Sequence, residues 1–323
     1  MRCMGTGAGL ICPRALFTMT RARYLRLKFS NTDSSIGVLL ITPLLLWILL
    51  TLFYPLVFTI QLSFTNVRYV GTPYNYVGLQ NYRSILTDPD FYSSLIRTGI
   101  WAAANVVLQI VGSLIVAVVL NQEFVGKTFL RNWIVLPWVL PTVVLAIMWT
   151  WILDPTLGIV NYMLQASKIT SSPVKFLSTP SYVLPTVIII NVWRWTPYLA
   201  IIVLAALQSI PKELYEAAAV DGATALQRFR FITLPSIRST LAVLTLFSAL
   251  WSSNIFDTIW LLTGGGPLNY STTLPLYIYR VSFQKFRFNL GAASSVLFFI
   301  MLTLFAFGYL YVIYKRGLER GVG

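Results

Sequence analysis

The polar residues most able to make specific contacts lie together in one segment, Glu216–Pro235 (EAAAVDGATALQRFRFITLP). This segment carries the carboxylates Glu216 and Asp221 and two arginines, in a chain in which only 11% of residues are charged. The chain has no histidine, which excludes histidine-based acid–base catalysis and histidine zinc sites. A polar segment between two long apolar runs therefore indicates a folded loop that touches a partner, with ordinary solvated surface charges as the alternative.

A second set of polar residues lies inside apolar stretches. Ionisable groups within a membrane are costly and usually functional, so Arg194 and Asp257 are candidates to line a path for a solute. The alternatives are an ion pair between helices and extension of the side chains to the membrane surface. Amides hydrogen-bond to hydroxyls, and aromatic faces stack on the apolar faces of rings. The residues that suit a solute with hydroxyl groups and rings on this ground are Asn105, Gln109, Trp251 and Asn254.

The elements that must position these residues are long apolar helices. Hydrophobic residues make up 57% of the chain, against about 45–50% in soluble proteins. Lipid does not tolerate unpaired backbone groups, and continuous apolar runs of about 20 residues do not fit the alternating pattern of a β-barrel. The sequence therefore predicts an all-α membrane protein with six transmembrane helices. They are placed at about Ile36–Phe58, Leu95–Leu120, Trp133–Leu153, Val183–Leu207, Leu241–Leu262 and Ala292–Tyr314.

The distribution of basic residues predicts how the helices are oriented. With six spans and a cytoplasmic N-terminus, fifteen lysines and arginines fall in inner segments and seven in outer loops, while Arg97 and Arg194 lie in or beside spans. This bias follows the positive-inside rule and predicts that both termini are cytoplasmic. It also places the Glu216–Pro235 segment in the cytoplasm. The net charge of +14 is thus explained by topology, and no nucleic-acid partner is expected.

The helices and the segments beyond them divide the chain into three parts. Residues 1–35 are expected to be a cytoplasmic N-terminal segment, residues 36–315 a six-helix domain with its polar loop at 208–236, and residues 316–323 a cytoplasmic tail. Residues 1–18 differ from the rest, and Met19 heads a basic run, so the true start of translation is expected at Met19. Cys3 and Cys12 lie on the reducing side of the membrane, so no disulfide is expected.

The polar loop is predicted to contain two short helices. Pro211 suits the first turn of a helix, so Lys212–Val220 is predicted to be helical. Gly222 can leave the right-handed region and end that helix. A second helix is predicted over Ala223–Thr233, stopped by Pro235. The two helices would form a compact knob bent at the glycine.

Two prolines, Pro137 and Pro141, lie inside the third predicted span. Proline frees backbone carbonyls and can kink a helix, although membrane helices also tolerate proline without a functional reason. The sequence leaves open whether these residues shape a kinked helix along a pathway or are simply tolerated.

The pattern of the polar loop resembles a known signature. Glu216-Ala217-Ala218, three residues, Gly222, nine residues, Ile232, one residue and Leu234-Pro235 are similar to the signature loop of bacterial ABC-importer permeases. Three outer segments resemble elements of sugar-type permeases, namely GLQNY at 78–82, TLGIVN at 156–161 and LTGGGP at 262–267. The resemblance implies that the loop docks on an ATPase subunit. The coupling residues it implies are Glu216, Ala217, Ala218, Asp221, Gly222, Ala223, Ile232, Leu234 and Pro235.

This resemblance implies a permease subunit of a type I ABC importer of the sugar or glycerol-phosphate (maltose-permease-like) class, in a bacterial inner membrane. Its implied partners are a second permease, an ATP-binding subunit dimer, an extracytoplasmic solute-binding protein and membrane lipid. The chain lacks the Gly-x-x-x-x-Gly-Lys-Ser/Thr phosphate loop, so it is expected to be non-catalytic and without a cofactor of its own, with ATP and Mg²⁺ bound by the ATPase. The alternative is an ion-gradient-driven secondary transporter that uses Asp257 and Arg194. A membrane enzyme is disfavoured by the absence of histidine and of paired carboxylates in the spans.

Overall fold

The computed structural model describes residues 31–69 and 71–320 and separates into two compact units, residues 1–55 and 56–323. The expectations for Cys3, Cys12 and Met19 concern residues outside the described part. Helices dominate the described residues, where the β pairing found is an isolated antiparallel bridge between Thr65 and Tyr76. The predicted all-α class is therefore confirmed.

The first unit contains one apolar helical segment. Helix α1 (Asn31–Ile48) passes through a π-helical turn, η1 (Leu49–Phe53), into α2 (Tyr54–Ser63), which continues into the second unit. The stretch Val38–Ser63 is long and apolar enough to cross a membrane. This stretch corresponds to the first predicted span.

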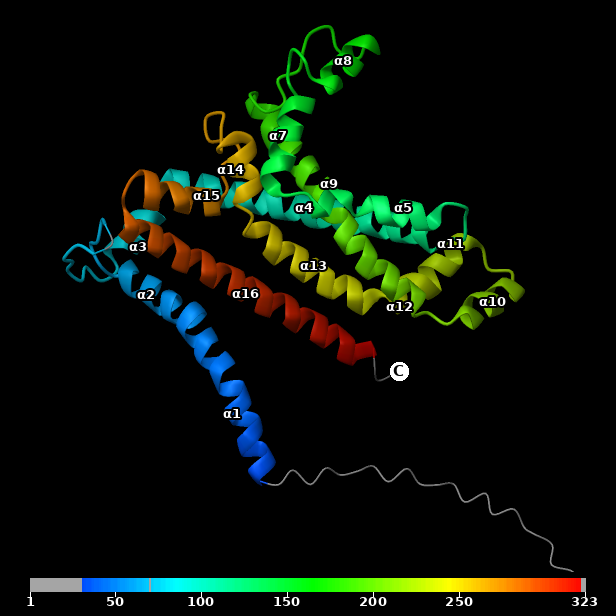
Figure 1. The fold of residues 1–323 in the computed structure, drawn as a ribbon, viewed down its shortest axis with the longest axis horizontal. Helices are drawn as coiled ribbons and strands as arrows, with labels where there is room; N and C mark the ends of the chain where they lie inside the picture. The colour runs from blue at the N-terminus through cyan, green and yellow to red at the C-terminus, as the bar shows by residue number, and fades with distance from the viewer. Residues whose placement is uncertain (1–30, 70, 321–323) are drawn as a thin grey trace, which may run out of the picture. The chain divides into compact units, whose positions relative to one another are not determined.

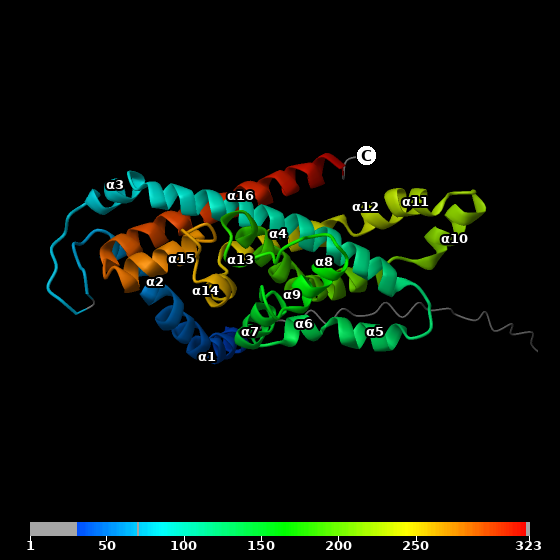
Figure 2. The same ribbon diagram turned by 90° about the horizontal axis from the view of Figure 1, so that it is seen from above.

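The second unit is built around four long helices, which are α4 (Pro89–Asn121), α9 (Pro180–Gln208), α13 (Arg238–Ser253) and α16 (Phe288–Arg320). Helices α4, α9 and α13 lie side by side in Figures 1 and 2. Buried apolar side chains such as Trp101, Val187 and Val203 fill the space between them. Burying this apolar surface fixes the helix packing that carries the candidate residues.

The third predicted span is broken. It consists of α5 (Lys127–Ile134) and α6 (Leu136–Val139), followed after a bend of 97° by α7 (Thr142–Ile152). Pro141 lies at the N-cap of α7, where its missing N–H leaves no unsatisfied donor. The predicted capacity of the prolines to kink this span is confirmed, since the bend lies at Leu140–Pro141.

The fifth predicted span, Leu241–Leu262, is wrong as a continuous helix. Helix α13 ends at Ser253, and a separate short helix, α14 (Asp257–Thr263), begins four residues later. The backbone N–H of Asn254 turns back to the carbonyl of Trp251 (3.1 Å), and the indole N–H of Trp101 donates to the Ser252 carbonyl (2.9 Å). A side chain from another helix thus satisfies a carbonyl at the end of α13, as helix termini require.

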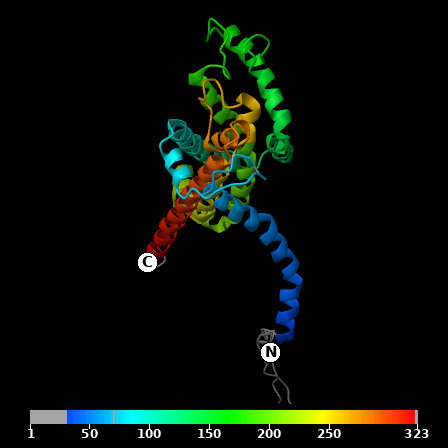
Figure 3. The ribbon, with the colours of Figure 1, turned by 90° about the vertical axis from the view of Figure 1, so that its left-hand side faces the viewer.

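The remaining described elements are short. The polar loop holds α10 (Lys212–Val220), α11 (Ala225–Arg228), the π-helical turn η2 (Phe229–Thr233) and α12 (Leu234–Ser236), and α12 meets α13 at a bend of 67°. The connecting segments form α3 (Gln80–Leu86), α8 (Ile159–Ala166), α15 (Leu274–Tyr279) and the π-helical turn η3 (Arg280–Gln284). In Figures 1 and 3 the green segment around α8 extends beyond the bundle.

The number of spans depends on how the broken helices are counted. Within the described residues, four helices are long and apolar enough to cross a membrane, and two bent pairs raise the number to six if each pair is one span. The prediction of six helices agrees with the larger number. The predicted inward orientation of both termini stays a prediction.

The segment GLQNY at 78–82 is organised by its asparagine. Asn81 is buried, and its amide donates to the backbone carbonyls of Ser63 (2.8 Å) and Thr65 (2.7 Å). Its side-chain oxygen accepts a hydrogen bond from Asn289 at the start of α16 (2.8 Å). Asn81 therefore ties the first loop to the last long helix.

The segment TLGIVN is organised in a similar way. The Asp154 carboxylate accepts hydrogen bonds from the backbone N–H groups of Leu157 and Thr156 (2.8 Å each), which lower the pKa of Asp154. The buried Asn161 amide donates to the carbonyls of Asp154 and Val174 (3.1 Å each). At Gly158 a Cβ atom would lie 2.4 Å from the Asp154 carbonyl oxygen, so this turn requires glycine.

Candidate functional site

The polar loop forms the predicted knob of two helical pieces. Helix α10 has the predicted bounds, Lys212–Val220, and Gly222 follows it with a left-handed φ of +77°. The backbone N–H groups of Gly222 and Ala223 donate to the carbonyls of Ala219 (3.1 Å) and Ala218 (2.9 Å). This pair of bonds is the Schellman arrangement, which closes a helix at a glycine. The prediction that Gly222 ends the first helix is confirmed.

The second helical piece differs from the prediction at its end. It starts at Ala225, continues through the π-helical turn η2 and includes Pro235 in α12, which ends at Ser236. The predicted stop at Pro235 is therefore wrong, and the chain instead bends at the buried Ile237. Thr224 and Gln227 form a reciprocal capping box at its start. The spacing Thr-x-x-Gln in the sequence is the signal that would have predicted this cap.

The knob presents both charge and apolar surface. Glu216, Ala217, Asp221 and Gly222 are exposed, as are Leu234 and Pro235, while Ala218, Ala223 and Ile232 are half-buried. The large apolar side chains of Val220, Leu226 and Phe231 are 89%, 74% and 70% exposed. A group of exposed apolar side chains of this kind marks an interaction surface.

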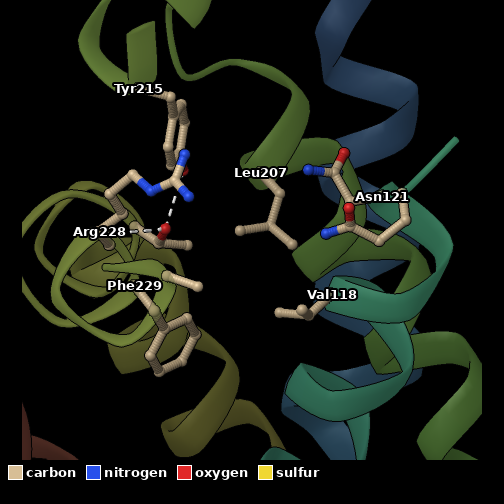
Figure 4. A pocket seen from close by; sticks show the side chains of 9 residues that line it. Val118, Asn121, Leu207, Tyr215, Arg228 and Phe229 are labelled. Carbon is tan, nitrogen blue, oxygen red and sulfur yellow. Dashed lines mark hydrogen bonds between the residues drawn. The ribbon is translucent and has the colours of Figure 1, made fainter. Parts of the chain in front are cut away.

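A cavity of about 450 Å³ separates the knob from the ends of α4 and α9 (Figure 4). Tyr215 and Arg228 lie on the side of the knob, and Asn121 and Leu207 face them from the two long helices. The Tyr215 hydroxyl shares a hydrogen bond of 2.8 Å with Thr233, which joins the two helical pieces to each other. The knob is thus braced internally while open space lies beneath it.

The two ionisable candidates inside the bundle lie together. The Arg194 guanidinium is 3.9 Å from the Asp257 carboxylate and donates to the Thr142 hydroxyl at 2.9 Å. Thr142 in turn donates to Asp257 at 2.8 Å. Thr142 is the first residue of α7, and Asp257 is the first residue of α14. Arg194 on α9 therefore links the two helices that follow the breaks in the third and fifth predicted spans. The interhelical ion pair, one of the roles left open by the sequence, is the arrangement found.

Two of the amide candidates are part of the helix packing. Asn105 and Gln109 are buried, and Asn105 accepts hydrogen bonds from Gln109 (3.1 Å) and from Asn191 on α9 (2.6 Å). Gln109 accepts a further bond from Ser248 on α13 (2.8 Å). This network joins three helices, and a solute would have to break it to reach either amide.

The third candidate, Trp251, belongs to a row of aromatic rings that the sequence analysis did not identify. Trp251 is 46% exposed, stacks on Phe247 (5.7 Å between ring centroids) and meets Trp195 edge-on (5.1 Å). The row continues through Tyr198 to Trp138 on α6, whose rings stack at 5.1 Å. We call these five residues the aromatic wall. The spacing of Phe247 and Trp251, four residues apart on one helix, was the available signal.

The remaining amide candidate, Asn254, lies in a different hollow. It lines a cavity of about 550 Å³ between α13, α15 and α16, together with Ser295 and Thr303. Its amide donates to the Leu250 carbonyl at 2.8 Å. Among the described residues, no group of three or more acidic, cysteine or histidine side chains is placed to hold a metal ion.

Comparison with known proteins decides the family. The sequence pattern of the family described as the binding-protein-dependent transport system inner membrane component matches residues 109–322, which include the knob, the aromatic wall and the Arg194–Asp257 pair. The chain belongs to this family. It is a permease of an ABC transport system, and the alternative of an ion-gradient-driven secondary transporter is not favoured.

Several relatives resemble this permease over most of their length. A trehalose/maltose transport system permease protein of Thermococcus litoralis is 32% identical over 286 residues, which cover 88% of this chain and 96% of the relative. The crystal structure of a bacterial ABC transporter that imports the acidic polysaccharide alginate matches with a TM-score of 0.78 at 26% identity, over 88% of this chain and 96% of the other. A bacterial alginate ABC transporter in complex with an alginate-bound periplasmic protein matches with a TM-score of 0.76, also at 26% identity, over 86% of this chain and 93% of the other. The permease therefore has the fold of type I ABC importer permeases.

Proposed function

We propose that this permease forms part of the path of an ATP-driven importer for a carbohydrate, in a bacterial inner membrane, with six spans and both termini in the cytoplasm. The exposed knob at 208–236 carries the proposal, because it joins a helix with an early acid, Glu216, to a glycine turn and uncovered apolar side chains. The excess of basic residues on the same side supports its cytoplasmic location. The knob would insert into an ATP-binding subunit, which together with its twin binds ATP and Mg²⁺.

The remaining partners follow from the same proposal. A second permease would complete the path, and an extracytoplasmic binding protein would deliver the solute. The permease itself would do no chemistry. Closure of the ATPase dimer would move the knob, and the spans would alternate between outward and inward access.

The carbohydrate class is supported by the aromatic wall and by the relatives, whose named solutes are trehalose, maltose and alginate. Exposed aromatic faces suit the apolar faces of sugar rings, and the wall spans three helices, of which α6 and α13 end at the two breaks. We place the solute path along Trp251 and Trp138 and retain Asn254, Arg194 and Asp257 as flanking candidates. Asn105 and Gln109 act in our proposal by holding the helices that carry the wall.

The first test concerns the knob. We expect Glu216→Lys to weaken the association of the permease with its ATPase by more than about 20-fold, because reversing a charge in an interface costs about 2 kcal/mol or more. The measurement is co-purification of the ATPase with the tagged transporter, together with uptake into proteoliposomes. Glu123→Lys is the matched control, since Glu123 is an exposed glutamate in the segment between α4 and α5. Wild-type association and uptake in Glu216→Lys would refute the coupling role.

The second test concerns the aromatic wall. We expect Trp251→Ala to raise the solute concentration for half-maximal uptake by about 3- to 10-fold, because a stacked aromatic contact contributes about 0.5–1.5 kcal/mol. The assay measures uptake into proteoliposomes by a transporter variant that works without its binding protein, so that the permease alone sets the affinity. Trp151→Ala, which removes an exposed tryptophan from the end of α7, serves as control. If Trp251→Ala and Trp151→Ala reached half-maximal uptake at the same solute concentration, the aromatic wall would not line the path.

A further inference from the structure

A second charged pocket lies at the end of the bundle remote from the knob. Asp90 at the start of α4 lines this pocket, and Asn121 at the end of α4 lines the cavity beneath the knob. At 1.5 Å per residue these positions are about 45 Å apart along the helix. Figures 1 and 2 likewise show α15, beside the pocket, and α10, in the knob, at opposite ends of the second unit. If the knob is cytoplasmic, the pocket opens on the extracytoplasmic side.

The pocket collects three cations. Arg97 from α4, Arg280 from η3 and Lys285 line it together with a single lining carboxylate, Asp90. Within the described part of the chain the two ion pairs are Lys127–Glu123 and Arg194–Asp257, so none of the three cations is paired with a carboxylate. The neighbouring carboxylate of Asp88 is engaged by the hydroxyl of Tyr277 at 2.6 Å. The pocket thus carries a net positive charge.

The cations are held in place by neutral groups. Arg280 donates to the carbonyl of Gly264 (2.5 Å), to the hydroxyl of Thr272 (3.2 Å) and to the side chain of Asn269. Its partial burial lowers the pKa of Arg280, while the charge of Asp90 acts in the opposite direction. The Arg97 guanidinium is half-buried over the ring of Tyr270, 5.7 Å from its centroid. Two preformed guanidinium groups with a single lining carboxylate, Asp90, between the three cations leave positive charge that can bind a further carboxylate.

The size of the pocket indicates what kind of anion fits. Its volume is about 270 Å³, below the range of about 300–1,000 Å³ that is usual for whole small-molecule ligands. It accommodates one or two side chains more readily than an oligosaccharide. The exposed Gln284 and Lys285 form its rim, so a protruding residue of another protein can enter.

We propose that this pocket receives an acidic side chain of the extracytoplasmic binding protein and thereby docks that protein on the permease. The inference rests on the orientation given under the proposed function. Docking through a positive pocket would fix the register of the binding protein over the path and accelerate its association, because complementary charges steer encounter and orientation.

The test measures the affinity of the cognate binding protein for the assembled transporter in nanodiscs. We expect Arg97→Glu and Lys285→Glu each to weaken this binding by about tenfold and to reduce its dependence on salt, as is usual for charges that steer association. Arg97→Lys keeps the charge but not the guanidinium, and it should lose less affinity than Arg97→Glu, which shows that the pocket still folds. Arg83→Glu is the matched control, because Arg83 is an exposed arginine on α3 that does not line the pocket.

Other outcomes overturn the proposal. Equal affinity in Arg97→Glu and Arg83→Glu would show that the pocket does not dock the binding protein. Unchanged docking combined with weaker solute affinity at saturating binding protein would assign the pocket to the solute instead. The binding measurement needs no transport, so a wild-type transporter that binds its partner but shows no ATP-dependent uptake would refute the proposed function and not the docking site.

Discussion

Replacing Gly222 by proline is expected to abolish ATP-dependent uptake while the permease still inserts into the membrane. Gly222 has a φ of +77° and its N–H donates to the Ala219 carbonyl. Proline fixes φ near −65° and has no N–H, so the native turn becomes unfavourable by about 3 kcal/mol or more. This corresponds to a fall of more than about 100-fold in the population of knobs with the correct angle between α10 and α11. No other atom lies within 4 Å of a Cβ at this position, so the effect comes from the backbone alone.

Uptake into proteoliposomes and stimulation of ATP hydrolysis by the loaded binding protein measure this effect. Gly126→Pro provides the matched control, because Gly126 has a φ of +90°, has equally open surroundings and lies before α5, outside the knob. If Gly222→Pro transported normally, or if the control lost as much activity, the glycine turn would not be the coupling element.

The second large effect is expected in stability, at the pair Arg194–Asp257. The Arg194 side chain is only 11% exposed, whereas that of Asp257 is 53% exposed. Losing Asp257 leaves a buried cation without its counter-charge, while losing Arg194 leaves a carboxylate that water can reach. Breaking a fully buried pair costs about 3–5 kcal/mol, and the exposure of Asp257 reduces this to about 1–3 kcal/mol. Asp257→Leu should therefore destabilise the permease more than Arg194→Met does.

Thermal unfolding of the purified permease measures both variants and their combination. We expect the double variant Arg194→Met/Asp257→Leu to be more stable than Asp257→Leu alone, because the second change removes the unpaired cation. Neutralising the pair Lys127–Glu123 is the control and should have little effect, since the Glu123 side chain is 92% exposed. Strictly additive losses in the double variant would show that the two charges do not interact.

The knob could be predicted from the sequence because its signals are local. A proline before Lys212, a glycine after Asp221 and the polar composition define α10 and its turn within a dozen residues. The end of the second piece was misplaced because proline stops a helix only where its ring clashes with the preceding turn. Here helical geometry continues from the π-helical turn η2 through Pro235, and the bend falls at Ile237.

The break in the fifth span could not be predicted from hydropathy. Composition is equally apolar on both sides of Ser253, and what ends α13 includes a hydrogen bond from Trp101, 151 residues earlier in the chain. Asn105 was predicted to contact the solute for the same reason. Its side-chain oxygen accepts a hydrogen bond from Asn191 on another helix, and hydropathy does not reveal such a partner. The aromatic wall likewise exists only once α6, α9 and α13 have packed.

The helical segments 225–236 and 238–253 form a rod that is bent by 67° where α12 meets α13. When a force acts along the first arm of a bent rod, only part of it acts along the second arm. The remainder rotates the second arm about the corner. The corner here is Ile237, which is 1% exposed and packed among the ends of α4 and α9, so its position is held by the bundle. The arm beyond it carries Phe247 and Trp251. If the knob moves with the ATPase as proposed, this geometry would convert a short stroke at the knob into a sideways swing of the far arm, without sliding a long helix along its own axis.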